Sequence, residues 1–350
     1  MTQRTWAGLL AVPLLLALWV IALITPLPFV TYQPGLTVDV LDAPHGKETI
    51  QIDGHKTYRD DGQLRLTTVY VTRPESDVNL LQLMAGWISA DDAVYPVRAV
   101  YPPGETDAAS QREGALEMVG SQDAAVAVAL TELGIHYDDA TKVVTVDQKA
   151  PAGGVLKPGD LVLAVNGKPV TTPSDVQKAV VASGSGKPLE LRIERSGSER
   201  TVTLTPEESD GQARIGIQLL PSYRFPFDVT VGIDDQIGGP SAGLMFSLGI
   251  YDTLTPGSLT DGRVVAGTGT IAPTGKVGPI GGIQQKIAAA RDTGAELFLV
   301  PSANCREALG AENGDMRLVR TSTMHDAVDA LKTWADDPDA DLPSCEEAAS

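Results

Sequence analysis

Two residues in the second half of the chain, Ser241 and Lys286, are of types that together can hydrolyse an acyl bond. Ser241 lies in the segment QIGGPSAGLMF (236–246), directly after a Gly-Gly-Pro sequence. A serine hydroxyl is a weak nucleophile until a neighbouring base removes its proton. The sequence therefore indicates a nucleophile at Ser241 only if the fold brings a base to it.

The residues on both sides of Ser241 predict a strand that leads into a helix. The segment FDVTVGID (227–234) places valine or isoleucine at every second position, as a half-buried strand does. Apolar residues then recur at helical spacing from Leu244 until a Thr-Pro-Gly sequence at 255–257. Pro240 suits the first helical position, so we expect Ser241 to lie too late in the chain to cap this helix.

Backbone amides near Ser241 are the expected oxyanion-binding groups. The first amides of a helix have no partner within the helix, and glycine lets a substrate backbone come close. We therefore expect Gly238, Gly239 and Ala242 to bind the oxyanion and the substrate backbone.

Histidine does not supply a convincing base for Ser241. None of the four histidines lies in a motif that suggests a Ser-His-Asp arrangement, namely His45, His55, His136 and His325. A lysine in the segment IGGIQQKIAAARDTG (280–294) is the better candidate.

Lys286 falls within the apolar stripe of a predicted helix. It lies three positions after Ile283 and four before Ala290, so its side chain leaves the helix on the apolar side. Such a lysine either reaches along the stripe to solvent or is desolvated. Desolvation lowers the pKa of an ammonium, which a general base at neutral pH requires.

Four motifs in this part of the chain resemble those of Lon-type peptidases and stand in the same order. The segment GPSAG (239–243) resembles the nucleophile motif, and PIGGIQQK (279–286) resembles the Gly-Gly-x-x-x-Lys motif of the base. Between and after them, TGTI (268–271) and LVPSAN (299–304) resemble the Thr-Gly-Glu-Ile and strand-Pro-x-x-Asn segments of the family.

This resemblance assigns roles to individual residues. It implies that Ser241 is the acylated nucleophile and that Lys286 takes its proton. Thr268 would hold the lysine in place by a hydrogen bond, with Thr270 as the alternative. The chemistry needs no metal and no other cofactor.

Two departures from the Lon-type pattern bear on mechanism. The family usually has an acidic residue three positions before the serine, where this chain has Gly238, so the role of that carboxylate is either absent or passes to Asp234 or Asp235. The chain also lacks the ATPase of Lon proteases proper. We therefore expect an enzyme that acts on flexible, already exposed segments.

A second resemblance covers 121–207. A helical segment at 124–134 is followed by PAGGVLKPGDLVLAVNGKPV (151–170) and a helix that starts near Thr172, an order that resembles a PDZ domain of the bacterial protease type. Such a domain binds a peptide as an added strand, with backbone amides around its terminal carboxylate. The nearest candidate for that carboxylate loop is 132–139.

The overall charge argues against nucleic acid as a partner. The chain has 27 Lys+Arg against 45 Asp+Glu, a formal charge of −18, which would repel a phosphate backbone. Two glycine-rich segments, 182–188 and 267–277, do not fit the phosphate-loop pattern because neither places a hydroxyl residue after its lysine. We expect no nucleotide site.

The N-terminal segment is apolar and uncharged from Trp6 to Ile24. This length is close to the ~20 residues that span a bilayer, and no convincing cleavage site follows it. Arg4 precedes the segment and no basic residue follows before Lys47, so we expect the N-terminus in the cytoplasm and the rest of the chain outside. In that compartment Cys305 and Cys345 could form a disulfide, with two free thiols as the alternative.

Together these features resemble the membrane-anchored PDZ-containing Lon-like serine peptidases of bacteria. We expect a mixed α+β fold and an ATP-independent endopeptidase whose PDZ domain presents envelope or secreted proteins. The resemblance also implies that the chain assembles as a homo-hexameric ring. The alternative is a membrane-tethered PDZ scaffold without catalysis. The expected divisions are a cytoplasmic N-terminus (1–5), a transmembrane helix (6–30), a first proteolytic part (36–120), a PDZ domain (121–207), a catalytic part (208–335) and an acidic tail (336–350).

Overall fold

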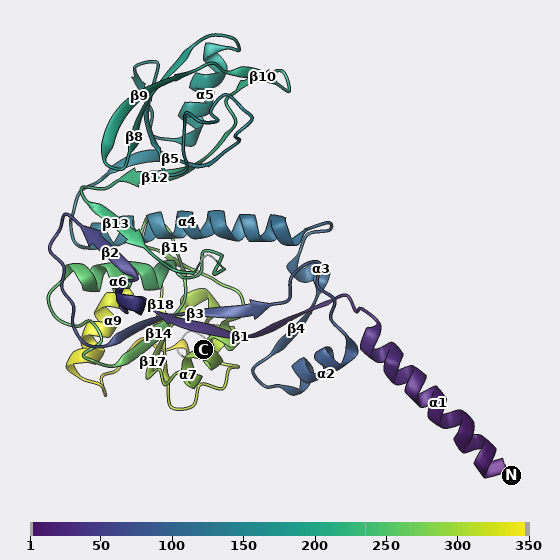
Figure 1. Ribbon diagram of the computed structural model, residues 1–350. Coiled ribbons are helices and arrows are strands. Elements are labelled where there is room, and N and C mark those ends of the chain that lie inside the picture. The colour runs from purple at the N-terminus through teal and green to yellow at the C-terminus, as the bar shows by residue number, and fades with distance from the viewer. Residues whose placement is uncertain (1–2, 235, 347–350) are drawn as a thin grey trace.

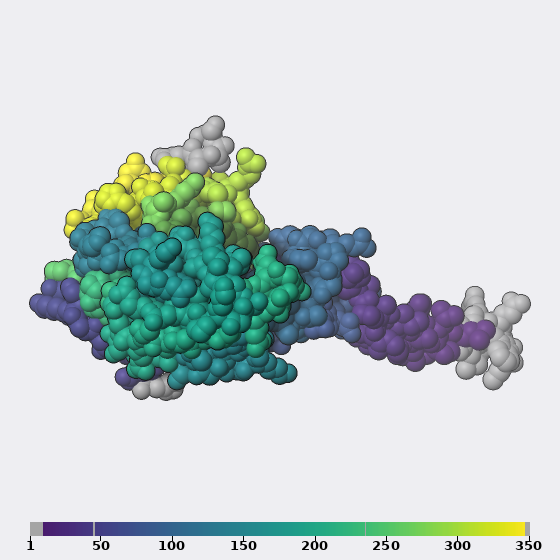
Figure 2. Space-filling model, turned by 90° about the horizontal axis from the view of Figure 1, so that it is seen from above, coloured from purple at the N-terminus to yellow at the C-terminus, as the bar shows by residue number. Residues whose placement is uncertain are grey.

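The computed structural model describes the backbone of residues 3–234 and 236–346, and side chains from residue 10 onward except that of His45. An N-terminal helix, α1 (Gln3–Ile24), leads into a larger body, and a smaller inserted unit (138–224) lies over one end of the long helix α4 (Asp107–Glu132). From above, the inserted unit covers part of the body while α1 projects away from it (Figures 1 and 2).

The transmembrane helix expected over 6–30 is not found in the part of the chain that the structure describes. Of the helices within the described ranges, none combines the length and apolar character needed to span a bilayer.

A six-stranded mixed sheet forms the centre of the body, in the order β18-β17-β14-β3-β1-β4. Strands β3, β14, β17 and β18 pair in parallel, whereas β1 pairs antiparallel with β3 and β4. The strands are β1 (Phe29–Asp39), β3 (Gln63–Val71), β4 (Ala93–Pro96), β14 (Val264–Gly267), β17 (Leu297–Pro301) and β18 (Arg317–Thr321).

Helices cover both faces of this sheet, as the alternating side chains of β17 show. Leu297 and Leu299 belong to one core cluster with α4, α6 and α9, and Phe298 and Val300 belong to another with α7 and α8. The helices are α6 (Gly243–Leu254), α7 (Ile283–Asp292), α8 (Cys305–Ala308) and α9 (Met324–Asp336).

Shorter elements complete the body. They are α2 (Leu80–Ile88), α3 (Val97–Val100), the 3₁₀ turns η1 (Pro44–Gly46) and η2 (Ser302–Asn304), the pair β2 (Ile50–Asp53) and β13 (Asp228–Val231), and the pair β15 (Thr270–Ile271) and β16 (Val277–Gly278).

The inserted unit has a sheet and a core cluster of its own. Its sheet runs β12-β5-β6-β8-β9, with β7 beside β6, and α5 (Pro173–Ser183) starts at a capping box of Thr172 and Asp175. The strands are β5 (Asp138–Val146), β6 (Leu161–Val165), β7 (Lys168–Pro169), β8 (Leu189–Arg195), β9 (Ser198–Leu204), β10 (Glu207–Ser209), β11 (Gln212–Arg214) and β12 (Ile217–Arg224).

The boundaries of this unit differ from the expected 121 and 207. The segment AAVAVAL (124–130) is buried in the core of the body as the second half of α4. At the other end, β12 pairs with β5 and so keeps residues up to Arg224 in the inserted sheet. An apolar segment of this kind suits the hydrophobic core of either unit, so the sequence alone does not show which unit buries it.

The C-terminal segment packs onto the body, although 336–350 was expected to be a tail. Cys345 forms a disulfide with Cys305 at the start of α8, and Leu342 is buried. The amide of Arg320 in β18 donates to the carbonyl of Pro343. The described part of the segment therefore covers the outer strand of the sheet.

Candidate active site

Ser241, Thr268 and Lys286 meet just beyond the end of β14, although they come from three different segments. The Nζ of Lys286 lies 2.7 Å from the Oγ of Ser241 and 3.0 Å from the Oγ1 of Thr268. The hydroxyl of Thr268 donates to the carbonyl of Ser241 at 3.1 Å, and the amide of Gly269 donates to the same carbonyl at 2.8 Å. The residues after β14 thus fix the serine backbone and the lysine together.

Helix α7 directs Lys286 inward from the sheet face that it covers. Gly282 precedes the helix with φ +68°, and a Cβ there would meet the side chains of Val69 and Tyr32. Ile283 and Ile287 are fully buried against the sheet, so the residue between them on that stripe is buried as well.

Lys286 is desolvated and does not reach solvent along the stripe. It is only 2% exposed, and within the described part of the chain no carboxylate pairs with it. Burial lowers the pKa of Lys286 to about 7, because the ammonium loses its hydration while the neutral amine loses little. This lysine can therefore be neutral at physiological pH and accept a proton from Ser241.

The rate of Ser241 acylation is expected to rise about tenfold per pH unit below pH 7 and to level off above it. Only the neutral amine of Lys286 can accept the serine proton, and its pKa is about 7. The test is the second-order rate constant for labelling by a fluorophosphonate between pH 5.5 and pH 9. A rate that does not change with pH over this range would contradict the role of a lysine base.

Thr268, and not Thr270, lies where it can position the lysine. Thr268 is 1% exposed and contacts both members of the dyad, whereas Thr270 lies in β15. A hydroxyl that accepts from Lys286 and donates to the Ser241 carbonyl keeps the lysine lone pair directed at the serine.

The substitution Thr268→Val is expected to slow acylation about tenfold, because one buried hydrogen bond to the lysine is lost. Thr268→Ser keeps the hydroxyl and should restore most of the rate. Labelling rates of the two variants against the parent chain check this. Equal loss in both variants would indicate that the residue matters for packing only.

The helix after the serine begins later than expected. It starts at Gly243 with Ala242 as its N-cap, so Pro240 is not its first residue and Ser241 lies in the turn before it. The amide of Leu244 donates to the carbonyl of Gly269 at 3.1 Å and not to that of Pro240, so no helical bond closes on Pro240. A Cβ at Gly243 would meet the side chains of Ile271 and Ser121, so the close packing of this first turn favours glycine. Ser241 still does not cap the helix.

Helix α4 holds the loop in front of Ser241, a contact that the sequence motifs did not predict. The amide of Gly239 donates to the carbonyl of Gly114 at 2.9 Å, and the hydroxyl of Ser121 donates to the carbonyl of Pro240 at 3.0 Å. Gly114 and Ser121 are seven residues apart, which places them on one face of α4. In the sequence, the spacing of these two small residues is the feature that could have indicated close packing against α4.

The amides around Ser241 divide into occupied and open ones. The amide of Gly239, expected to bind substrate, is occupied by Gly114, and the amide of Gly243 donates to Pro240 at 3.4 Å. Within the described part of the chain, the amides of Ser241, Ala242 and Gly238 have no hydrogen-bond partner. These open amides lie beside the nucleophile and are available to a developing oxyanion.

The dyad opens into a cleft of 810 Å³ between α4, β3 and the loop at 232–242. Ser241, Ala242, Gly238 and Lys286 line it. Asp234 also lines this cleft, and its carboxylate accepts from the amide of Gln236, whereas Asp235 lies outside the described residues.

The described histidines lie elsewhere. His55 stacks on Phe227, His325 pairs with Glu132, and His136 is exposed beside Asp138. Among the residues that the structure describes, no group of three or more His, Cys, Asp or Glu side chains is placed to hold a metal ion.

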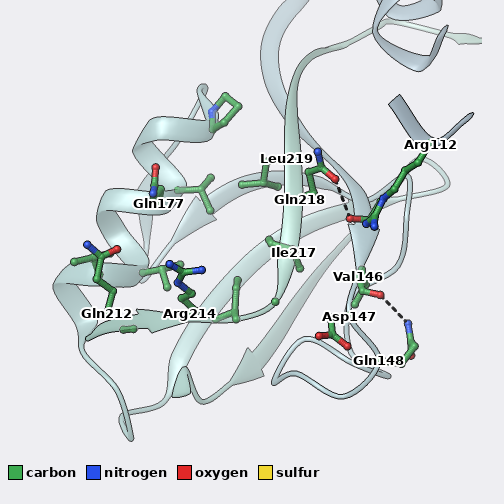
Figure 3. A pocket seen from close by; sticks show the side chains of 18 residues that line it. Arg112, Val146, Asp147, Gln148, Gln177, Gln212, Arg214, Ile217, Gln218 and Leu219 are labelled. Atoms are coloured by element: carbon green, nitrogen blue, oxygen red, sulfur yellow. Dashed lines mark hydrogen bonds between the residues drawn. The ribbon is translucent and has the colours of Figure 1, made fainter. Parts of the chain in front are cut away.

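A second cleft, of 890 Å³, lies in the inserted unit between α5 and strands β11 and β12 (Figure 3). Val176, Val180, Ile215, Ile217 and Leu219 give it an apolar lining. The backbone of β12 forms one wall of this cleft. Among the described strands, β12 pairs only with β5, so its other edge is free. An extended peptide could therefore pair with the free edge of β12.

The candidate carboxylate loop at 132–139 does not line this cleft. The segment that does so is 212–219, which comprises β11, the connection at 215–216 and the start of β12. Residues 132–139 instead end α4 and begin β5.

Comparisons with known proteins identify both units. Residues 131–205 match the PDZ domain family, and residues 235–329 match the Lon protease (S16) C-terminal proteolytic domain. Each match covers less than half of the chain. The chain thus carries a PDZ domain and a Lon-type proteolytic domain, and the latter supports a peptidase.

Two relatives share parts of the sequence. Zinc metalloprotease RasP of Geobacillus kaustophilus is 44% identical over 63 residues, which are 18% of this chain and 14% of the relative. Lon protease 2 of Bacillus subtilis is 33% identical over 95 residues, which are 27% of this chain and 17% of the relative. The chain therefore spans less than a fifth of the length of either protein.

A solved structure resembles part of the chain. The PDZ domain of an SdrC-like protein from Listeria innocua shows 19% sequence identity and covers 23% of this chain and 93% of its own, with a TM-score of 0.22.

Proposed function

We propose that this protein is an ATP-independent serine endopeptidase in which Ser241 and Lys286 form the catalytic dyad. The observation that carries the proposal is the 2.7 Å contact between the Ser241 hydroxyl and the amine of a buried lysine. The pKa of about 7 allows that amine to be neutral when it is needed as a base.

In the acylation step, Lys286 takes the proton of Ser241 while Oγ attacks the carbonyl carbon of a peptide bond. The negative charge moves to the carbonyl oxygen, where the open amides of Ser241 and Ala242 can donate to it. The ammonium of Lys286 then gives its proton to the leaving nitrogen, the C–N bond breaks, and the acyl group stays on Oγ.

In the deacylation step, Lys286 takes a proton from water, whose oxygen attacks the ester carbonyl. The ester bond breaks, Ser241 recovers its proton from Lys286, and a carboxylic acid leaves. Thr268 keeps the lysine directed at the serine through both steps.

The substrates that suit this arrangement are flexible, exposed protein segments. The catalytic cleft is open to solvent, and a polypeptide must enter it extended for a peptide bond to reach Ser241. The PDZ cleft along β12 supports the capture of such a segment by strand addition.

A second candidate function is a PDZ scaffold without catalysis, and the size of the PDZ cleft favours it. The two candidates differ in what the full chain does to β-casein, an unfolded protein. A peptidase cleaves β-casein and loses this activity in Ser241→Ala, whereas a scaffold leaves it intact. N-terminal proteomics of cells carrying the parent chain or Ser241→Ala would then identify the clients.

Attachment to a membrane and an extracytoplasmic location are part of the same proposal. Side chains of α1 from Leu10 to Ile24 are mostly apolar and exposed, and such a surface is costly in water. The Cys305–Cys345 disulfide is consistent with an oxidising compartment. Cell fractionation with protease accessibility tests the location.

A homo-hexameric ring is proposed by resemblance to Lon-type domains. Light scattering on the full chain in detergent measures the mass of the assembly.

A further inference from the structure

Helix α4 forms a wall of both clefts, with different faces. Asp107, Gln111, Ala115 and Met118 follow one another at helical spacing and line the cleft that contains Ser241. Arg112 lies about 100° around the helix from Gln111 and lines the PDZ cleft. One helix therefore borders both clefts, and a chain that passes from one cleft to the other beside Arg112 crosses α4.

Polar contacts fix the PDZ unit on α4. The Nζ of Lys142 in β5 lies 2.5 Å from both carboxylate oxygens of Asp123 on α4, and the hydroxyl of Ser222 in β12 donates to the same carboxylate at 2.7 Å. The Asp123 and Lys142 side chains are both largely buried. The rings of Tyr137, Tyr223 and Phe225 pack against one another at the same junction, two of the three pairs edge to face. These contacts join the PDZ unit to the helix that carries Arg112.

Arg112 is a cation without a counterion. It is exposed, and within residues 3–234 and 236–346 its guanidinium makes no hydrogen bond or ion pair. The other arginine of the PDZ cleft, Arg214, lies 3.3 Å from Asp210. Figure 3 shows the side chain of Arg112 pointing toward Gln218, on the side of β12 away from α5 and Gln212. The guanidinium of Arg112 is therefore available to an anionic group of a segment bound in the PDZ cleft.

We propose that Arg112 is a specificity-determining residue that binds a carboxylate of the substrate segment held in the PDZ cleft. The proposal rests on the proposed peptidase function and names its substrate class: an extended, apolar segment with a carboxylate at the α4 end. The apolar lining of the cleft accounts for the first property and Arg112 for the second.

The same geometry sets a spacing between the bound carboxylate and the scissile bond. A helix with its side chains is about 10–12 Å thick. An extended chain advances about 3.3 Å per residue, so roughly three to four residues are the least that can cross α4. Cleavage should therefore occur at least that far from the carboxylate.

Capture of peptides on the inactive protein tests the role of Arg112 without requiring turnover. The full chain carrying Ser241→Ala is immobilised and incubated with a synthetic decapeptide library, prepared once with free C-termini and once with C-terminal amides. We expect peptides with a carboxylate at one position to be enriched about fivefold, the upper range for an exposed ion pair. Enrichment of Asp and Glu in the amide batch identifies a side-chain carboxylate, and enrichment confined to free C-termini identifies a terminal one.

Charge reversal provides the decisive comparison. In the Ser241→Ala background, Arg112→Gln should remove the enrichment and Arg112→Glu should shift it to Lys and Arg. Arg200→Glu makes the same charge change at an exposed position of β9 that lines neither cleft, and should keep it. Equal enrichment with and without Arg112→Glu, or no capture at all, would overturn the proposal.

The parent chain, incubated with the same library, distinguishes failure of this inference from failure of the proposed function. Cleavage at least three residues from the enriched carboxylate supports both. A chain that captures acidic peptides and cleaves none is no peptidase, but its Arg112 has the proposed role.

Discussion

Replacement of Lys286 by methionine is expected to slow the acylation of Ser241 by a fluorophosphonate at least about 10³-fold. Methionine has a similar length and fits an apolar stripe, but it cannot accept a proton. The hydroxyl of Ser241 would then keep its proton, because no other described side chain with a basic nitrogen lies against its Oγ. Gel-based labelling of the full chain at pH 8 measures the loss.

Two matched variants make this result specific. Lys286→Arg keeps the positive charge and the donor capacity, but a guanidinium does not deprotonate in proteins, so it should be as inactive as Lys286→Met. Ser241→Ala removes the labelled atom and sets the background. Labelling of Lys286→Met at the parent rate would eliminate the dyad, and labelling of Lys286→Arg would show that charge rather than basicity matters.

The sequence alone was sufficient to select Ser241 and Lys286 as candidates, because each lies in a recognisable local pattern. Lys286 lies in an apolar stripe, where its side chain must either be buried or extend along the stripe to solvent. In the structure it is buried, with 2% exposure. The apolar recurrence around it is a property of a single helix. A local pattern of this kind needs no knowledge of the remaining chain.

The contributions of α4 could not be predicted in the same way. Gly114 and Ser121 act on the loop before Ser241 through contacts that join residues more than a hundred positions apart. Their spacing marks a small-residue face on a helix but does not say which segment packs there. The start of α6 at Gly243 also depends on distant residues. Pro240 satisfies the local rule, but the amide of Leu244 donates to Gly269 and the carbonyl of Pro240 accepts from Ser121.

The substitution Lys286→Met is also expected to stabilise the fold at pH 7 while it abolishes activity. The unfolded lysine has a pKa of 10.5 and the folded one about 7, so between these values unfolding takes up a proton. As the pH falls from 10.5 to 7, this proton uptake increasingly favours the unfolded state. Methionine takes up no proton, so the variant does not lose stability in this way. At pH 7 the effect on the free energy of unfolding is on the order of 4 kcal/mol.

The pH dependence separates this effect from ordinary changes in packing. Hydrogen bonds lost to Ser241 and Thr268 change the stability of the variant by an amount that does not depend on the charge of residue 286. The difference in free energy of unfolding between variant and parent should therefore decrease by about 3 kcal/mol from pH 7 to pH 10. Urea titrations at both pH values measure it, with Lys168→Met as the control for loss of an exposed lysine. A difference that stays constant would mean that Lys286 keeps its proton in the folded protein, and the amine could not then serve as the base.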